Sequence, residues 1–206
     1  MITSSDLGIA VTTGYGKLHL KTAPTTPVIT TAEAKTHLRI DSSFTADDTY
    51  IDALVSAATQ SAENYLNMKI MEQTWQLFLD CFPSYIDLMT SNPRALVVNS
   101  IKYLDTKNIS QTLDSSNYVV DDKIKPSRVY KSVDGSFPDT YESPNAVTVE
   151  FTLGYSSAND VPNAIKQAIL LLVGSMYENR MSVSDRSYKE VPQTVEFLLE
   201  LYRVQR

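Results

Sequence analysis

The segment VPNAIKQAILLLVGSMYENR, residues 161–180, constrains the fold more than any other part of the chain. It carries no charge between Ala168 and Tyr177, so a helix over 162–180, with Pro162 in its first turn, is apolar on nearly every side. A membrane span needs roughly 20 apolar residues, and the uncharged run holds about ten. Two interpretations remain: a buried core helix, or a helix that packs on a neighbouring copy of the same chain.

The composition is that of a globular protein without a general affinity for nucleic acid. The chain has 206 residues, of which 43% are hydrophobic, enough for one domain or two small ones. Its net charge is -6, which argues against a nucleic-acid coat because Lys and Arg lead phosphate binding. Cys81 is the single cysteine and cannot form an internal disulfide. Asp6 interrupts the N-terminus, which lacks the apolar core of a signal peptide.

Two helices are predicted before residue 70. Thr30 and Glu33 have the spacing of a capping box, which predicts a helix over 31–39. Thr45 precedes a second helix over 46–66, with Asp47 and Asp48 in its first turn. Its apolar residues form one continuous stripe at helical spacing: Ile51, Leu54, Val55, Ala58, Ala62, Tyr65 and Leu66.

From Gln73 the hydrophobic period changes to two. Trp75, Leu77 and Leu79 alternate, and short strands separated by turn residues follow up to residue 155. The order helix, helix, strands, helix, helix predicts an α+β protein. Two N-terminal and two C-terminal helices then pack as a small helical bundle, with an antiparallel β insert over 73–155 between them.

The ends of the chain are predicted to be separate segments. Residues 1–17 form an N-terminal extension, either a hairpin around Gly14 to Gly16 or an arm that orders on a partner. Residues 18–182 form the main domain, and residues 183–206 a polar linker with a final helix. In that helix Val195, Leu198, Leu199 and Tyr202 form a stripe, whereas Phe197 and Leu201 lie off it.

Residues suited to chemistry are few. A nucleophilic site in a small enzyme would have to use His19 or His37, and neither has a recognisable partner in the sequence. Cys81 has no CxxC neighbour. The acidic group Asp41, Asp47, Asp48 and Asp52 lacks the glycine and the terminal glutamate of a calcium loop. We therefore predict no catalytic residue, no metal and no cofactor.

A basic segment, Lys123 to Lys131, offers the one candidate contact to DNA or to a DNA-filled lumen. Its cations are Lys123, Lys125, Arg128 and Lys131, with Tyr130 among them. A DNA-contacting accessory module would use them for the phosphate backbone. The alternative is an exposed pair of strands with a solvated charged face, which the acidic total favours.

Several motifs in a fixed order resemble the phage head–tail connector (adaptor, or head-completion) family of long-tailed phages, prophages and gene transfer agents. They are TAEAKTHLRI, QTW, the stretch from GY through DVPNAIKQAILLLV to YENR, and VPQTVEFLLELYR. The resemblance runs from about Leu18 to the C-terminus. Residues 1–17 extend beyond the usual start, and the segment between Ile86 and Asn145 is not diagnostic.

The resemblance implies a structural protein of the virion neck, assembled in the host cytoplasm and without catalytic residues or a membrane partner. Such a protein forms a homo-oligomeric ring of twelve subunits that docks on the portal protein. It joins the DNA-filled capsid to a tail-side neck, stopper or tail-terminator protein. Genomic DNA passes through the lumen without sequence specificity.

The resemblance assigns the final helix to portal docking, and the spare apolar side of the third helix is expected to meet a neighbouring subunit of the ring. The portal-docking residues are Phe197, Leu198, Leu201, Tyr202, Arg203 and Arg206. The inter-subunit residues are Leu170, Leu171, Val173, Met176, Tyr177 and Arg180, while Ala164, Ile165, Ala168, Ile169 and Leu172 pack inward on the stripe of 51–66. Two alternatives stay open: the β insert covers the outer side of the third helix, or the final helix folds back on its own subunit.

Overall fold

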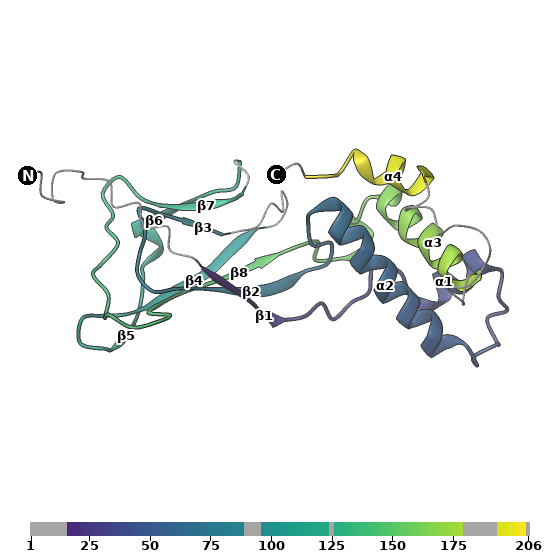
Figure 1. The fold of residues 1–206 in the computed structure, drawn as a ribbon, viewed down its shortest axis with the longest axis horizontal. Helices are drawn as coiled ribbons and strands as arrows, with labels where there is room; N and C mark the ends of the chain where they lie inside the picture. The colour runs from purple at the N-terminus through teal and green to yellow at the C-terminus, as the bar shows by residue number, and fades with distance from the viewer. Residues whose placement is uncertain (1–15, 89–95, 124–125, 179–192, 205–206) are drawn as a thin grey trace, which may run out of the picture. The chain divides into compact units, whose positions relative to one another are not determined.

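A computed structural model describes residues 16–88, 96–123, 126–178 and 193–204, which form two compact units. The β unit contains the described residues among 1–21, 74–90 and 97–152, and the helical unit those among 22–73, 91–96 and 153–206. Figure 1 shows the strands of the first unit and the four α-helices of the second. The predicted α+β class is confirmed.

The helical unit contains α1 (Thr31–Leu38), α2 (Asp48–Leu66), α3 (Asn163–Glu178) and α4 (Gln193–Glu200). The predicted capping box is present, because the Thr30 side chain accepts from the Glu33 amide and the Glu33 carboxylate accepts from the Thr30 amide. α2 begins two residues later than predicted. Asp47 occupies its N-cap without a side-chain capping bond, and its carboxylate accepts from the Tyr177 hydroxyl.

The core of the helical unit lies where α2 meets α3. The predicted stripe of α2 is confirmed, because Ile51, Val55, Ala58, Ala62 and Leu66 are buried while Leu54 and Tyr65 pack on the core partly exposed. From α3 the buried residues are Ile165, Ala168, Ile169, Leu172 and Val173. Val173 was expected on the side facing a neighbouring subunit. That expectation is wrong, because the side chain is fully buried in the subunit's own core.

α4 closes the same core through one of its faces. Val195 and Leu199 are fully buried, as is Val204 four residues beyond the helix. The Val204 amide donates to the Leu66 carbonyl oxygen at 2.9 Å. One face of the C-terminal helix therefore folds back on its own subunit, as the alternative held.

The β unit contains two sheets. The five-stranded sheet has the order β1 (Lys17–Thr22), β2 (Gln73–Leu79), β8 (Val147–Leu153), β4 (Val97–Leu104) and β5 (Ser110–Thr112). The three-stranded sheet has the order β3 (Tyr85–Asp87), β7 (Arg128–Lys131) and β6 (Tyr118–Asp121). The pairs β4–β8, β4–β5, β3–β7 and β6–β7 are antiparallel, which confirms the predicted antiparallel character of the β region.

The five-stranded sheet differs from the predicted insert in one respect. β1 precedes all four α-helices in the chain, yet it is hydrogen-bonded to β2 at the edge of this sheet. The sheet is thus completed by a strand from outside residues 73–155. The first strand of the proposed N-terminal hairpin lies outside the described residues.

Candidate interaction surfaces

α4 and the residue that follows it carry the most exposed large apolar side chains among the described residues of the helical unit. Phe197 is 81% exposed and Leu201, one helical turn later, is 86% exposed. They alternate along the chain with the buried Val195 and Leu199, so this C-terminal segment has one face in the core and another in solvent. Exposed large apolar side chains grouped in this way are typical of a protein-binding site.

The other predicted docking residues have partners within the subunit. Leu198 and Tyr202 pack partly on the core. The Arg203 guanidinium carbon lies 4.9 Å from the centre of the Tyr65 ring, and an Arg203 nitrogen lies 3.5 Å from a Glu200 oxygen. Arg206 lies outside the described residues. The structure thus presents Phe197 and Leu201 to solvent and gives the other described members of the group internal contacts.

On α3 the predicted inter-subunit residues are half-buried. Leu170, Leu171 and Met176 pack against the core and keep part of their surface exposed. Tyr177 is also half-buried, and its hydroxyl donates to Asp47 at 2.7 Å while its ring lies 6.1 Å from that of Tyr50. Arg180 lies outside the described residues.

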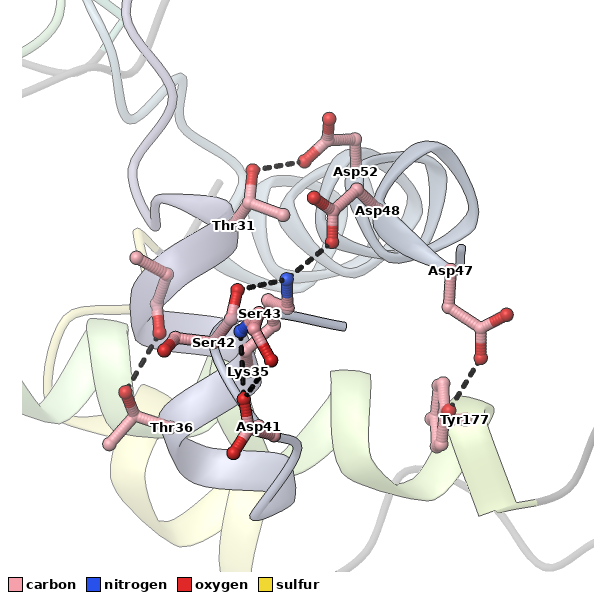
Figure 2. Close-up of polar contacts among 11 residues, drawn as sticks. Thr31, Lys35, Thr36, Asp41, Ser42, Ser43, Asp47, Asp48, Asp52 and Tyr177 are labelled. Atoms are coloured by element: carbon pink, nitrogen blue, oxygen red, sulfur yellow. Dashed lines mark hydrogen bonds and ion pairs between the residues drawn. The ribbon is translucent and has the colours of Figure 1, made fainter. Parts of the chain in front are cut away.

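The acidic residues around the start of α2 are engaged in contacts within the subunit, as Figure 2 shows. A carboxylate oxygen of Asp48 lies 2.7 Å from the Lys35 ammonium, and Asp52 accepts from the Thr31 hydroxyl at 2.6 Å. Asp41 accepts from the amide and hydroxyl of Ser43, and these hydrogen bonds lower the pKa of its carboxyl group. Among the described residues no group of three His, Cys, Asp or Glu could hold a metal ion.

The residues suited to an enzyme lie in structural positions. His19 belongs to the exposed strand β1, and Cys81 follows β2 as a half-buried free thiol. His37 packs against Gly174 of α3: a Cβ added there would lie 3.5 Å from the His37 Nε2. The contact with α3 fits a packing role for His37 better than nucleophilic catalysis.

Carboxylates on the two neighbouring strands lie beside the basic segment. Arg128 lies in register with Asp87 on β3 and with Asp121 on β6. Its guanidinium carbon is 4.8 Å from the centre of the Tyr85 ring, and its Nη1 donates to the Tyr130 hydroxyl at 3.4 Å. The side chains of Lys123 and Lys131 are exposed, and Lys125 lies outside the described residues. Carboxylates beside Arg128 oppose a phosphate backbone there.

Comparison with known families decides the class of the chain. A sequence model of the head completion protein family matches residues 27–204. The chain belongs to the head completion protein family. Membership confirms the resemblance found in the sequence motifs and the expected class of function, a structural part in completing the head of a phage-like particle. No curated protein sequence matches the chain significantly.

Solved chains with the same fold as this head completion family member come from gene transfer agent particles. One is from the neck of an empty particle computed with C6 symmetry and another from the virion of a native particle; each has a TM-score of 0.71. A third, from the neck of a native particle computed with C12 symmetry, has a TM-score of 0.66. All three are 21% identical to this chain, and the matches cover 92% of it and 96% of each of them.

Sequence reasoning missed the residues that hold the C-terminal helix of this family member in place. Tyr65 donates from its hydroxyl to Glu200 at 2.7 Å, and Asn67 donates from its side chain to the Val204 carbonyl oxygen at 3.1 Å. Tyr65 was read only as part of the α2 stripe. Its place at the end of that stripe, beside a polar segment, was the one available signal.

None of the described helices has the length and apolarity required to cross a membrane.

Proposed function

We propose that the chain is a head–tail connector of a tailed phage or related particle. In this proposal it forms a ring, of twelve subunits by analogy with the C12 neck, that docks on the portal protein and joins the DNA-filled capsid to a tail-side neck, stopper or tail-terminator protein. Genomic DNA passes through the lumen without sequence specificity, and the protein is located in the neck of the virion.

Family membership and the likeness to chains from gene transfer agent necks support this proposal. The observation that carries it is the exposure of Phe197 in α4 and of Leu201 directly after α4, on a segment whose opposite face is buried. Two large apolar side chains one turn apart form the anchor of a helix-in-groove contact. We assign this pair to portal docking.

The contact between neighbouring subunits is proposed to use the half-exposed side of α3. Leu170, Leu171 and Met176 supply apolar surface there, and Val173 is removed from the contact because it is buried. A ring requires two different faces of each subunit to meet. This side of α3 would be one of them.

The test is binding to the purified portal ring encoded in the same genome. The double variant F197D+L201D is expected to weaken binding by at least about thirtyfold, because truncating a hot spot costs about 2 kcal/mol or more. V133D is the matched control, since Val133 is fully exposed and apolar but belongs to the β unit. It should bind as the unmodified chain does. Unchanged binding of the double variant would reject the docking face.

The stoichiometry of the complex tests the ring. Native mass spectrometry or cryo-electron microscopy of the portal-bound chain should show twelve copies. Another number of copies would reject the dodecamer, whereas no binding of the unmodified chain to its own portal would reject the connector role.

A further inference from the structure

We propose that Tyr65 and Asn67 are positioning residues for portal docking, because they hold α4 against α2 in the orientation that turns Phe197 and Leu201 outward. Their contacts with Glu200, Arg203 and Val204, together with the Leu66–Val204 backbone bond, are called the clasp below. The inference rests on the proposed function of α4 and adds how the chain presents that site.

The backbone half of the clasp fixes the segment that follows α4. The Val204 amide donates to the carbonyl oxygen of Leu66, the last residue of α2, at 2.9 Å. The Asn67 side chain donates to the Val204 carbonyl oxygen at 3.1 Å. A carbonyl in the last turn of α2, which has no partner within the helix, is thereby satisfied. The Val204 side chain between these bonds is 1% exposed.

The side-chain half of the clasp fixes the end of α4 itself. The Tyr65 hydroxyl donates to the Glu200 carboxylate at 2.7 Å, and Glu200 is the last residue of α4. Arg203 stacks on the Tyr65 ring and lies 3.5 Å from Glu200. Tyr65 therefore contacts two residues of the C-terminal segment, one through its hydroxyl and one through its ring.

The clasp determines which residues a portal can reach. An eight-residue helix is not stable in water by itself, so α4 depends on these contacts and on burial of Val195 and Leu199. With that face held inward, Phe197 and Leu201 are directed to solvent. Leu198, Tyr202 and Arg203 then make contacts within the subunit. The portal meets Phe197 and Leu201 already in their binding orientation. A preformed site loses less conformational entropy on binding.

A graded series of variants tests the clasp: Y65F, Y65F+N67G, and Y65F+N67G+V204A. Y65F removes only the hydroxyl, and N67G removes the donor while tolerating the left-handed backbone of Asn67, whose φ is 55°. Amide hydrogen exchange reports the opening of α4 without the portal. Loss of one hydrogen bond should raise the exchange rate at 195–204 by about fivefold. V204A should raise this rate by about a further tenfold, because it also leaves a cavity in the core. Exchange in α1, which packs on α2 and α3, should stay unchanged, which shows that the unit remains folded.

Portal affinity in the same series gives the decisive readout. Affinity should fall in proportion to the closed fraction of α4, by at least about tenfold in the triple variant, because only the closed form is competent. Unchanged affinity with an opened α4 would overturn the inference, since the released segment would then dock equally well. Increased affinity would also overturn it, because the clasp would then be inhibitory.

A second variant separates this inference from the proposed function. F197A+L201A leaves every clasp contact in place, so exchange at 195–204 should match the unmodified chain while portal affinity falls. If F197A+L201A binds the portal normally, the docking face is wrong whatever the clasp does. If it loses binding and the clasp series does not, only the clasp inference fails.

Discussion

The Lys35 ammonium lies 2.7 Å from an Asp48 carboxylate oxygen, and the lysine is the more deeply buried partner of this ion pair. The Lys35 side chain is 7% exposed and that of Asp48 is 35% exposed. The pair joins α1 to the first turn of α2, with a further bond from Lys35 to the Ser42 carbonyl oxygen. The two ends of this contact should therefore tolerate substitution differently.

We expect D48A to destabilise the chain more than K35M. D48A leaves a buried ammonium without its counter-ion, at a cost of about 2 kcal/mol after allowance for the exposure of Asp48. K35M leaves a carboxylate that can turn to water, at a cost below about 1 kcal/mol. Urea denaturation of both variants measures the difference. Equal losses of unfolding free energy, or a larger loss for K35M, would contradict the expectation that removing the carboxylate costs more than removing the ammonium.

Gly154 and Gly174 should respond to alanine in opposite directions. Gly154 has a φ of 105°, and an added Cβ would collide with the Met71 carbonyl group, so G154A should cost at least about 2 kcal/mol. Gly174 lies within α3, where a Cβ meets only His37 at ordinary contact distance, so G174A should gain about 0.5–1 kcal/mol. Thermal melts of the two variants provide the comparison, with each serving as the control for the other.

The capping box should give α1 a pH-dependent stability. Hydrogen bonds from the amide and hydroxyl of Thr30 lower the pKa of Glu33 below its ordinary 4.5. A lowered pKa in the folded state stabilises the chain above about pH 4.5, and this contribution is lost as the pH falls through the folded-state value. At pH 7 the E33A variant should be less stable by about 1 kcal/mol.

The comparison of E33A with the unmodified chain from pH 7 down to pH 3 checks this expectation. The difference in unfolding free energy should shrink on the acid side. T30A removes the hydroxyl donor and should lose part of the same pH-dependent term. A difference that stays constant over the whole range would assign it to helix propensity instead.

Arg128 and Lys131 should differ although both belong to the basic segment. Arg128 stacks on Tyr85 and donates a hydrogen bond to Tyr130, so R128A should destabilise the chain. Lys131 is exposed, and K131A should change stability by less than about 0.5 kcal/mol.

The affinity of the chain for duplex DNA, measured at several salt concentrations, tests the DNA-contacting alternative. Affinity that falls steeply with salt and is lost in K131A would support the DNA-contacting alternative.

Local periodicity predicted most of the elements. The stripe from Ile51 to Leu66 is buried as its spacing requires, and the alternation in β8 is complete, because Val147, Val149, Phe151 and Leu153 are all buried. The Thr30–Glu33 box begins α1 as expected. These signals lie within single helices or strands, where side-chain spacing alone determines which face is apolar.

The misses concern contacts between distant segments. The pairing of β1 with β2 and the bond between Val204 and Leu66 join parts of the chain whose relation no local pattern encodes. The hydrogen bond from Tyr177 to Asp47, 130 residues apart, is of the same kind. Val173 was misplaced because α3 is apolar on several sides, and periodicity could not distinguish the side that meets its own core from the side left over.

The position of Val204 in the core has a consequence for biosynthesis. The helical core contains residues from Val28 to Val204, so the Val204 side chain is made after all the others of this core. During translation α1, α2 and α3 leave the ribosome with an apolar surface that α4 has yet to cover. Closure of this core therefore has to wait for the synthesis of Val204, and chains that stop before it expose the unfinished surface to chaperones and proteases.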